Sequence, residues 1–98
     1  MEPVTHYLKS WAHFYDAIEA GEKMYDLRDA RDREFNIGDY VLLQRYDMVA
    51  GVYTGEELLL QISYITDRDT PCALSSVVLS EGFAILGYQF VHEDETKH

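Results

Sequence analysis

The sequence predicts an α+β fold in which about five strands form a small β-barrel with one or two flanking helices. Only one early stretch has the apolar spacing of a helix, and the rest of the chain alternates between strand-like runs and turns. The longest strand-like run, residues 57–66, carries apolar side chains on both faces, which is typical of a central strand. Closing such a sheet into a barrel would remove its exposed edges.

Length and composition indicate one domain over residues 1–98, with a flexible acidic tail after about residue 91. Cys72 is the only cysteine, so no intrachain disulfide can form. The start of the chain lacks the pattern of a signal peptide, and no apolar run approaches the length needed to cross a bilayer. We therefore expect a soluble cytoplasmic protein with no membrane partner, and the sequence leaves its oligomeric state open.

The net charge of −10 argues against a broad electrostatic grip on nucleic acid, because such affinity comes mainly from neutralising phosphates. The basic residues are unevenly distributed, however. The first third of the chain contains most of them, namely Lys9, Lys23, Arg28, Arg31 and Arg33. The sequence is therefore compatible with a local basic pocket on an acidic body, but not with a long basic stripe.

The first predicted elements are a strand at residues 4–9 and a helix at residues 11–20. Ser10 is the expected N-cap of this helix, because its hydroxyl can accept a hydrogen bond from a free backbone amide. Gly21 can adopt the left-handed backbone conformation that ends a helix. The helix has one apolar face with i, i+3, i+4 and i+7 spacing, formed by Trp11, Phe14, Tyr15 and Ile18.

Alternating residues predict four further strands bounded by turn residues, at 24–28, 40–46, 57–66 and 83–91. Residues 47–55 contain two glycines and are expected to form a long hairpin connection. Residues 73–79 fit either a short strand or a single helical turn. In the longest strand, one face is formed by Leu58, Leu60, Ile62 and Tyr64.

Lys23, Asp26 and Arg28 place two basic groups and a carboxylate within six residues at the start of a strand. Strand alternation puts Asp26 and Arg28 on one face, and Lys23 joins them only if the turn after Gly21 rotates it round. A purely structural interpretation is a salt-bridge network that fixes the strand. The functional interpretation is a polar site in which Arg28 presents its planar guanidinium to a ligand and Asp26 holds it in place.

His6 and Lys9, which flank the first predicted strand, are further candidates for such a site. A histidine there is more often a hydrogen-bonded structural group than a catalyst. No pair of histidines has metal-ligand spacing with a supporting carboxylate, so we predict no metal and no cofactor.

The order of several short motifs identifies a family resemblance over roughly residues 5–88. These motifs are His6-x-Leu8-Lys9, the helix at 11–20, Gly21-x-Lys23-x-x-Asp26-x-Arg28, Phe35-x-x-Gly38-Asp39, Tyr53-Thr54-Gly55 and Gly82-Phe83-Ala84-Ile85-Leu86-Gly87. Together they resemble the ASCH-type domains of the PUA-like superfamily. The resemblance is closest to an uncharacterised family of small single-domain bacterial and phage proteins.

This resemblance implies a PUA-like β-barrel with a cleft between the barrel and the helix. It implies a binding module for RNA or a nucleotide-like small ligand. The ligand-binding candidates are Lys23, Asp26, Arg28, His6 and Lys9.

The resemblance also implies an alternative function. Some small relatives are amidohydrolases that act on N4-acetylcytidine through a lysine, a threonine and a glutamate. Lys23 matches the lysine, but Asp26 stands at the position of the threonine, and Glu81 is only a distant candidate for the glutamate. Under this alternative, Lys23 and Asp26 are the catalytic candidates.

Overall fold

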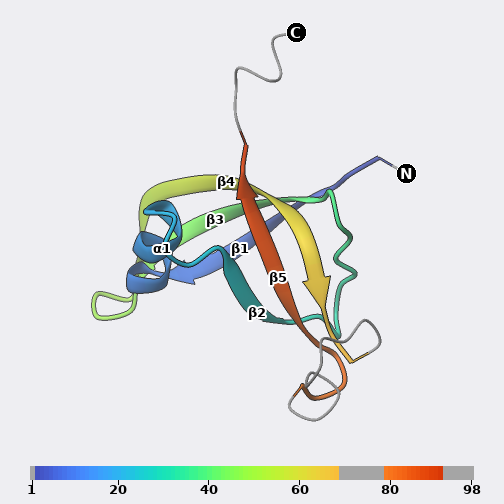
Figure 1. The fold of residues 1–98 in the computed structure, drawn as a ribbon. Coiled ribbons are helices and arrows are strands. Elements are labelled where there is room, and N and C mark those ends of the chain that lie inside the picture. Colours follow the sequence, from blue (N-terminus) through green and yellow to red (C-terminus); the bar gives the residue numbers. More distant parts are fainter. Residues whose placement is uncertain (1, 69–78, 92–98) are drawn as a thin grey trace, which may run out of the picture.

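The chain forms a five-stranded mixed sheet that curls into a half-barrel, with one short helix beside it (Figure 1). The computed structural model describes residues 2–68 and 79–91. The predicted α+β class is confirmed. The elements are β1 (Thr5–Trp11), α1 (Ala12–Glu19), β2 (Tyr25–Asp29), β3 (Tyr40–Asp47), β4 (Val52–Thr66) and β5 (Phe83–Phe90).

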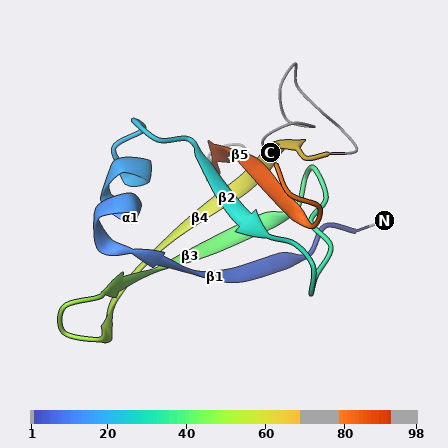
Figure 2. The same ribbon diagram turned by 90° about the horizontal axis from the view of Figure 1, so that it is seen from below.

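The order of the strands in the sheet is β1-β3-β4-β5-β2. Strand β1 runs parallel to β3, and the other neighbouring strands are antiparallel. The central position predicted for the longest strand is confirmed, because β4 lies between β3 and β5. The two edge strands, β1 and β2, come close to each other on the side that Figure 2 shows. We call the gap between these two edge strands the seam.

The hydrophobic core fills the inside of the half-barrel, because alternate side chains of every strand point inward. Burying each large apolar side chain in this way contributes about 1.5 to 3 kcal/mol. Phe35, from the connection between β2 and β3, also enters the core. The inward-pointing strand residues of the core include Leu8, Val41, Leu43, Leu60, Ile62, Ala84 and Leu86.

Helix α1 covers one end of the half-barrel with a narrower apolar face than the sequence predicts. Tyr15 and Ile18 are buried, whereas Trp11 and Phe14 remain 45% and 40% exposed. Gly21 ends the helix with a φ of +79°, as expected, and its amide bonds to the Ile18 carbonyl at 2.9 Å.

The prediction that Ser10 caps the helix is wrong. Parallel pairing of β1 with β3 continues through Ser10 and Trp11, so the strand ends two residues later than expected. Trp11 is the N-cap residue and makes no side-chain cap bond. Ser10 instead shares the inward direction of His6 and Leu8, and it is only 3% exposed.

Two predictions about β4 also need correction. The strand begins at Val52, so residues 52–55 of the expected connection belong to β4 itself. A short turn at residues 48–51 joins β3 to β4. An irregularity in the pairing with β5 between Ile62 and Tyr64 then reverses the alternation. As a result, Tyr64 is 56% exposed, whereas Ile65 packs against the core.

No helix within residues 2–68 and 79–91 is long and apolar enough to span a membrane. The predicted acidic tail lies outside the described residues, as does the ambiguous segment apart from Leu79.

Candidate ligand site at the seam

Asp26 gathers three donors around one buried carboxylate at the seam. Its Oδ1 accepts a hydrogen bond from Lys23 Nζ at 3.0 Å, and its Oδ2 accepts one from Arg28 Nη2 at 3.1 Å. Tyr88 Oη donates to the same Oδ2 at 3.1 Å. Only 7% of the Asp26 residue is exposed. We call these four residues the Asp26 cluster.

The turn after α1 brings Lys23 to this cluster. The backbone amides of Glu22 and Lys23 both bond to the Ala17 carbonyl, so the chain wraps round the end of the helix before β2 begins. Lys23 Nζ then also donates to the Tyr25 carbonyl at 2.6 Å. The rotation that strand alternation alone could not supply is therefore provided by the glycine-ended turn.

The β2–β5 pair positions the other members of the cluster. Asp26 lies opposite Leu86, and Arg28 lies opposite Ala84. Both residues belong to the inward-facing set of β2. The Tyr88 amide bonds to the Met24 carbonyl at 2.9 Å, which places the Tyr88 ring beside the start of β2.

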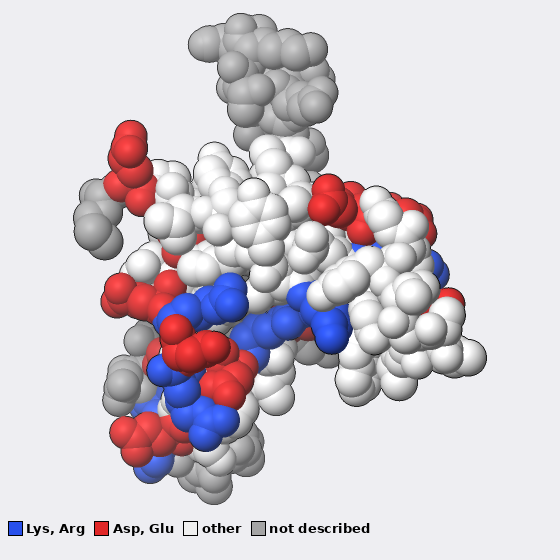
Figure 3. Space-filling view, turned by 180° about the vertical axis from the view of Figure 1, so that it is seen from behind, with Lys and Arg blue, Asp and Glu red and all other residues white. Residues whose placement is uncertain are grey.

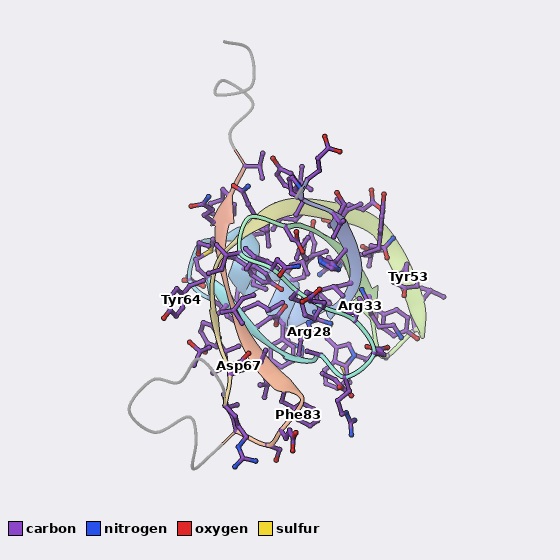
Figure 4. All side chains as sticks on the ribbon, turned by 90° about the vertical axis from the view of Figure 1, so that its right-hand side faces the viewer. Arg28, Arg33, Tyr53, Tyr64, Asp67 and Phe83 are labelled. Atoms are coloured by element: carbon purple, nitrogen blue, oxygen red, sulfur yellow. The ribbon has the colours of Figure 1, made fainter. Side chains whose placement is uncertain are left out.

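Arg28 connects the two edge strands across the seam. Its Nη2 donates to the Lys9 carbonyl of β1 at 2.9 Å as well as to Asp26. Figure 4 shows Arg28 inside the ring of strands, whereas Tyr53 and Tyr64 lie on the outside. Backbone pairing between β1 and β2 is absent from the described ladders. The guanidinium therefore bridges a gap that the sheet itself leaves open.

Two adjoining hollows open above the Asp26 cluster. The larger, of about 340 Å³, is lined by Lys9, Ser10, Trp11, Phe14, Asp26, Leu27 and Arg28. The smaller, of about 200 Å³, is lined by Phe14, Lys23, Tyr25, Asp26 and Leu27. They share three lining residues, so they lie next to each other between the start of α1 and strand β2. The larger hollow reaches the lower end of the range for small-molecule pockets, about 300 to 1,000 Å³.

Exposed aromatic rings surround these hollows. The rings of Trp11 and Phe14 are stacked, with centroids 5.9 Å apart and planes 15° apart. Lys23 Nζ lies 5.4 Å from the Phe14 ring centroid and 4.7 Å from that of Tyr25, which is 53% exposed. We call Trp11, Phe14 and Tyr25 the aromatic rim. Flat, exposed rings beside fixed cations suit a planar ligand that carries negative charge or oxygen acceptors.

The charges of the cluster do not cancel. Lys23 and Arg28 contribute two positive charges against the single negative charge of Asp26, so the site is locally cationic on an acidic protein. Burial raises the pKa of Tyr88, and the neighbouring Asp26 charge raises that pKa further. Tyr88 therefore stays protonated at neutral pH and acts as a hydrogen-bond donor to Asp26.

The other two sequence candidates do not join the Asp26 cluster through their side chains. His6 Nε2 donates to Asp39 Oδ2 at 2.9 Å, in a buried pair next to the connection between β2 and β3. Lys9 directs its ammonium over the Tyr46 ring, 4.3 Å from the centroid, and contributes only its backbone carbonyl to the seam.

The structure adds two residues that sequence reasoning missed, Tyr88 and Ser10. The sequence did contain a signal for each. Tyr88 follows Ala84 and Leu86 at every second position of the last strand, and Ser10 follows His6 and Leu8 in the same way, so both belong to an inward-facing set. Within the described part of the chain, no group of three His, Cys, Asp or Glu side chains is arranged to hold a metal.

Residues 5–88 match the family described as Domain of unknown function (DUF3850). Since this match covers most of the chain, the protein belongs to the DUF3850 family. No curated protein matches it.

Proposed function

We propose that this DUF3850 domain is a binding module for RNA or a nucleotide-like small ligand, held at the seam between β1 and β2. The observation that carries the proposal is the locally cationic Asp26 cluster beneath the aromatic rim. The resemblance of the sequence to ASCH-type, PUA-like domains supports the same class of ligand.

Each part of the site has a role that suits a nucleotide. A base stacks on the aromatic rim, because every base has a flat face that aromatic side chains can contact. Lys23 and Arg28 donate hydrogen bonds to ligand oxygens. Asp26 fixes both cations before the ligand arrives, which reduces the entropy lost on binding.

The distribution of charge favours a small or single-stranded ligand over a long duplex. The net charge is −10, and a long nucleic acid would be repelled by the acidic body. Figure 3 shows one face on which basic side chains form a narrow strip and otherwise lie among acidic ones. The described residues of that face offer no broad basic surface for a phosphate backbone.

A hydrolase that uses Lys23 as a base is the less supported alternative. A lysine base must accept a proton, whereas Lys23 Nζ donates hydrogen bonds to the Asp26 carboxylate and to the Tyr25 carbonyl. Glu81 lies just before Phe83, the first residue of β5, which pairs with Asp29. Lys23 lies just before Tyr25, which is at the opposite end of the β2–β5 pair. These hydrogen bonds and the distance along the sheet from Glu81 support a binder over a hydrolase.

A binding titration tests the proposal. Short single-stranded RNAs and nucleoside monophosphates are titrated into the protein at several salt concentrations. We expect Lys23→Gln to weaken RNA binding at low salt and to reduce the salt slope by about one. We expect Phe14→Leu to weaken binding by about 1 to 3 kcal/mol, because it removes a stacking surface.

Matched variants away from the site serve as controls. Arg31→Gln removes an exposed cation beyond the end of β2, and Tyr64→Leu removes an exposed ring from the outside of the half-barrel. Both should bind as the wild type does. Equal losses in the site variants and the controls would reject the seam as the binding site. Turnover of an acylated nucleoside that disappears in Lys23→Gln would instead support the hydrolase.

A further inference from the structure

The Ser10 hydroxyl is a polar group that neither the fold nor the Asp26 cluster uses. Ser10 lines the larger hollow and is only 3% exposed, yet its Oγ has no hydrogen-bond partner within the described residues. A buried hydroxyl without a partner is costly, because folding has removed its hydrogen bonds to water without replacing them. The register of β1 on β3 nevertheless directs this hydroxyl inward, toward the seam.

Arg28 has a similar unused donor. Its Nη2 is occupied by Asp26 and the Lys9 carbonyl, but its Nε–H is buried and has no partner among the residues that the structure describes. Arg28 also lines the larger hollow. Two residues that line the same hollow, one from each side of the seam, therefore each carry a buried polar atom without a partner.

We propose that Ser10 Oγ and Arg28 Nε together bind a carbonyl oxygen of a nucleobase. The inference rests on the proposed nucleotide-binding function and names the group that the site reads. A carbonyl oxygen has two lone pairs, so it can accept one hydrogen bond from the hydroxyl and one from the guanidinium. An exocyclic amino group at the same place would meet the Arg28 donor with a donor of its own.

The balance of charge favours a neutral carbonyl over a phosphate. Arg28 is already paired with Asp26, and Ser10 carries no charge. The other cation that shares the Asp26 carboxylate, Lys23, lines the smaller hollow and not this one. Burying a phosphate there would cost far more than burying a carbonyl oxygen. The apolar walls formed by Trp11, Phe14 and Leu27 also suit a base.

A small movement of Arg28 gives the ligand access to both atoms. The two atoms are covered in the structure, although the residues that hold them line the hollow. The bond from Arg28 to the Lys9 carbonyl is exposed, whereas the bond to Asp26 is partly buried. The exposed bond is the one that breaks when the guanidinium turns its Nε–H toward the ligand.

The test compares nucleotides that have a ring carbonyl with one that has none. UMP, CMP, IMP and AMP are titrated into the wild type and into Ser10→Ala. IMP and AMP have nearly the same shape, but IMP has a carbonyl where AMP has an amino group. We expect Ser10→Ala to weaken the binding of UMP, CMP and IMP by about five- to tenfold and to leave the binding of AMP unchanged. Arg28→Lys removes Nε together with the Nη2 bonds to Asp26 and the Lys9 carbonyl, so it should weaken the binding of all four nucleotides, and that of UMP, CMP and IMP more than that of AMP.

Controls separate this inference from the proposed function. Ser63→Ala, an exposed serine on β4, should change neither binding nor selectivity. Ser10→Ala should also keep or raise the melting temperature, because it removes a buried group without a partner. Equal effects on all four nucleotides, or no effect, would overturn the inference and leave the proposed function intact. Stronger competition by inorganic phosphate in the wild type than in Ser10→Ala would also overturn it, because the pair would then read phosphate. No binding of any nucleotide would overturn both.

Discussion

At the level of single residues, Asp26 is the group on which the candidate site depends. It accepts hydrogen bonds from Lys23, Arg28 and Tyr88, and the side chains of Asp26, Lys23 and Arg28 are at most 22% exposed. Asp29 lies on the same strand and pairs with Arg31, but both of those side chains are largely exposed. One strand therefore offers a buried ion-pair network and a solvated ion pair for direct comparison.

Asp26→Ala should lower the free energy of unfolding by about 3 kcal/mol, because it leaves two cations and a phenol near the core without their shared acceptor. Asp29→Ala should leave the unfolding midpoint unchanged, because water screens and replaces its exposed pair. Urea denaturation monitored by circular dichroism checks both variants. Equal shifts in the two midpoints would show that the cluster contributes no more than a surface pair.

At the level of elements, Asp39 fastens the start of β1 to the connection that leads into β3. Its carboxylate accepts hydrogen bonds from the His6 ring and from the backbone amides of Val4 and Asn36. Burial by itself would raise the pKa of Asp39, but these hydrogen bonds outweigh burial and hold that pKa below its usual value. The interaction is therefore a source of stability that depends on pH.

The sign of this dependence follows from the lowered pKa. The stabilisation is fully present above the unfolded-state pKa, about 3.9, and is lost as the pH falls through the lower pKa of the folded state. Asp39→Asn should be less stable than the wild type at pH 7 by about 1 to 3 kcal/mol. It should also lose less stability between pH 5 and pH 3. Urea midpoints measured across this range check the prediction, and parallel curves for the two proteins would contradict it.

At the level of the whole molecule, the half-barrel is closed only weakly. Strands β3, β4 and β5 have a neighbour on each side, whereas β1 and β2 each have one. Across the seam between them, Arg28 supplies a side-chain hydrogen bond to the Lys9 carbonyl. A ligand at the seam would therefore contact the part of the sheet that opens most easily.

Hydrogen exchange tests this view of the seam. We expect the β1 and β2 amides to exchange faster than those of β4, and Arg28→Ala to increase exchange in β1 and β2 several-fold while β4 stays protected. Arg31→Ala, on an exposed arginine beyond β2, provides the control. A uniform increase in every strand of Arg28→Ala would mean that Arg28 stabilises the whole fold and not the seam.

Sequence patterns predicted the strands well where the backbone stays regular. The spacing of inward residues identified β3 and β5 almost to their ends, because alternation is a local property of an extended chain. The prediction failed at Tyr64, where a bulge reverses the alternation, and at Ser10, where pairing with β3 extends the strand past the expected helix start. Both failures come from contacts with a neighbouring strand, which a single sequence segment cannot show.

The sequence by itself determined the α+β class, the five strands, the helix end at Gly21 and the shared face of Asp26 and Arg28, since each follows from local backbone preferences. Only the tertiary structure decided which groups meet. It brought Lys23 and Tyr88 to Asp26, and it turned His6 away to Asp39. The physical reason is that the order of the strands and the curl of the sheet arise from pairing between distant segments. That pairing determines which side chains become neighbours.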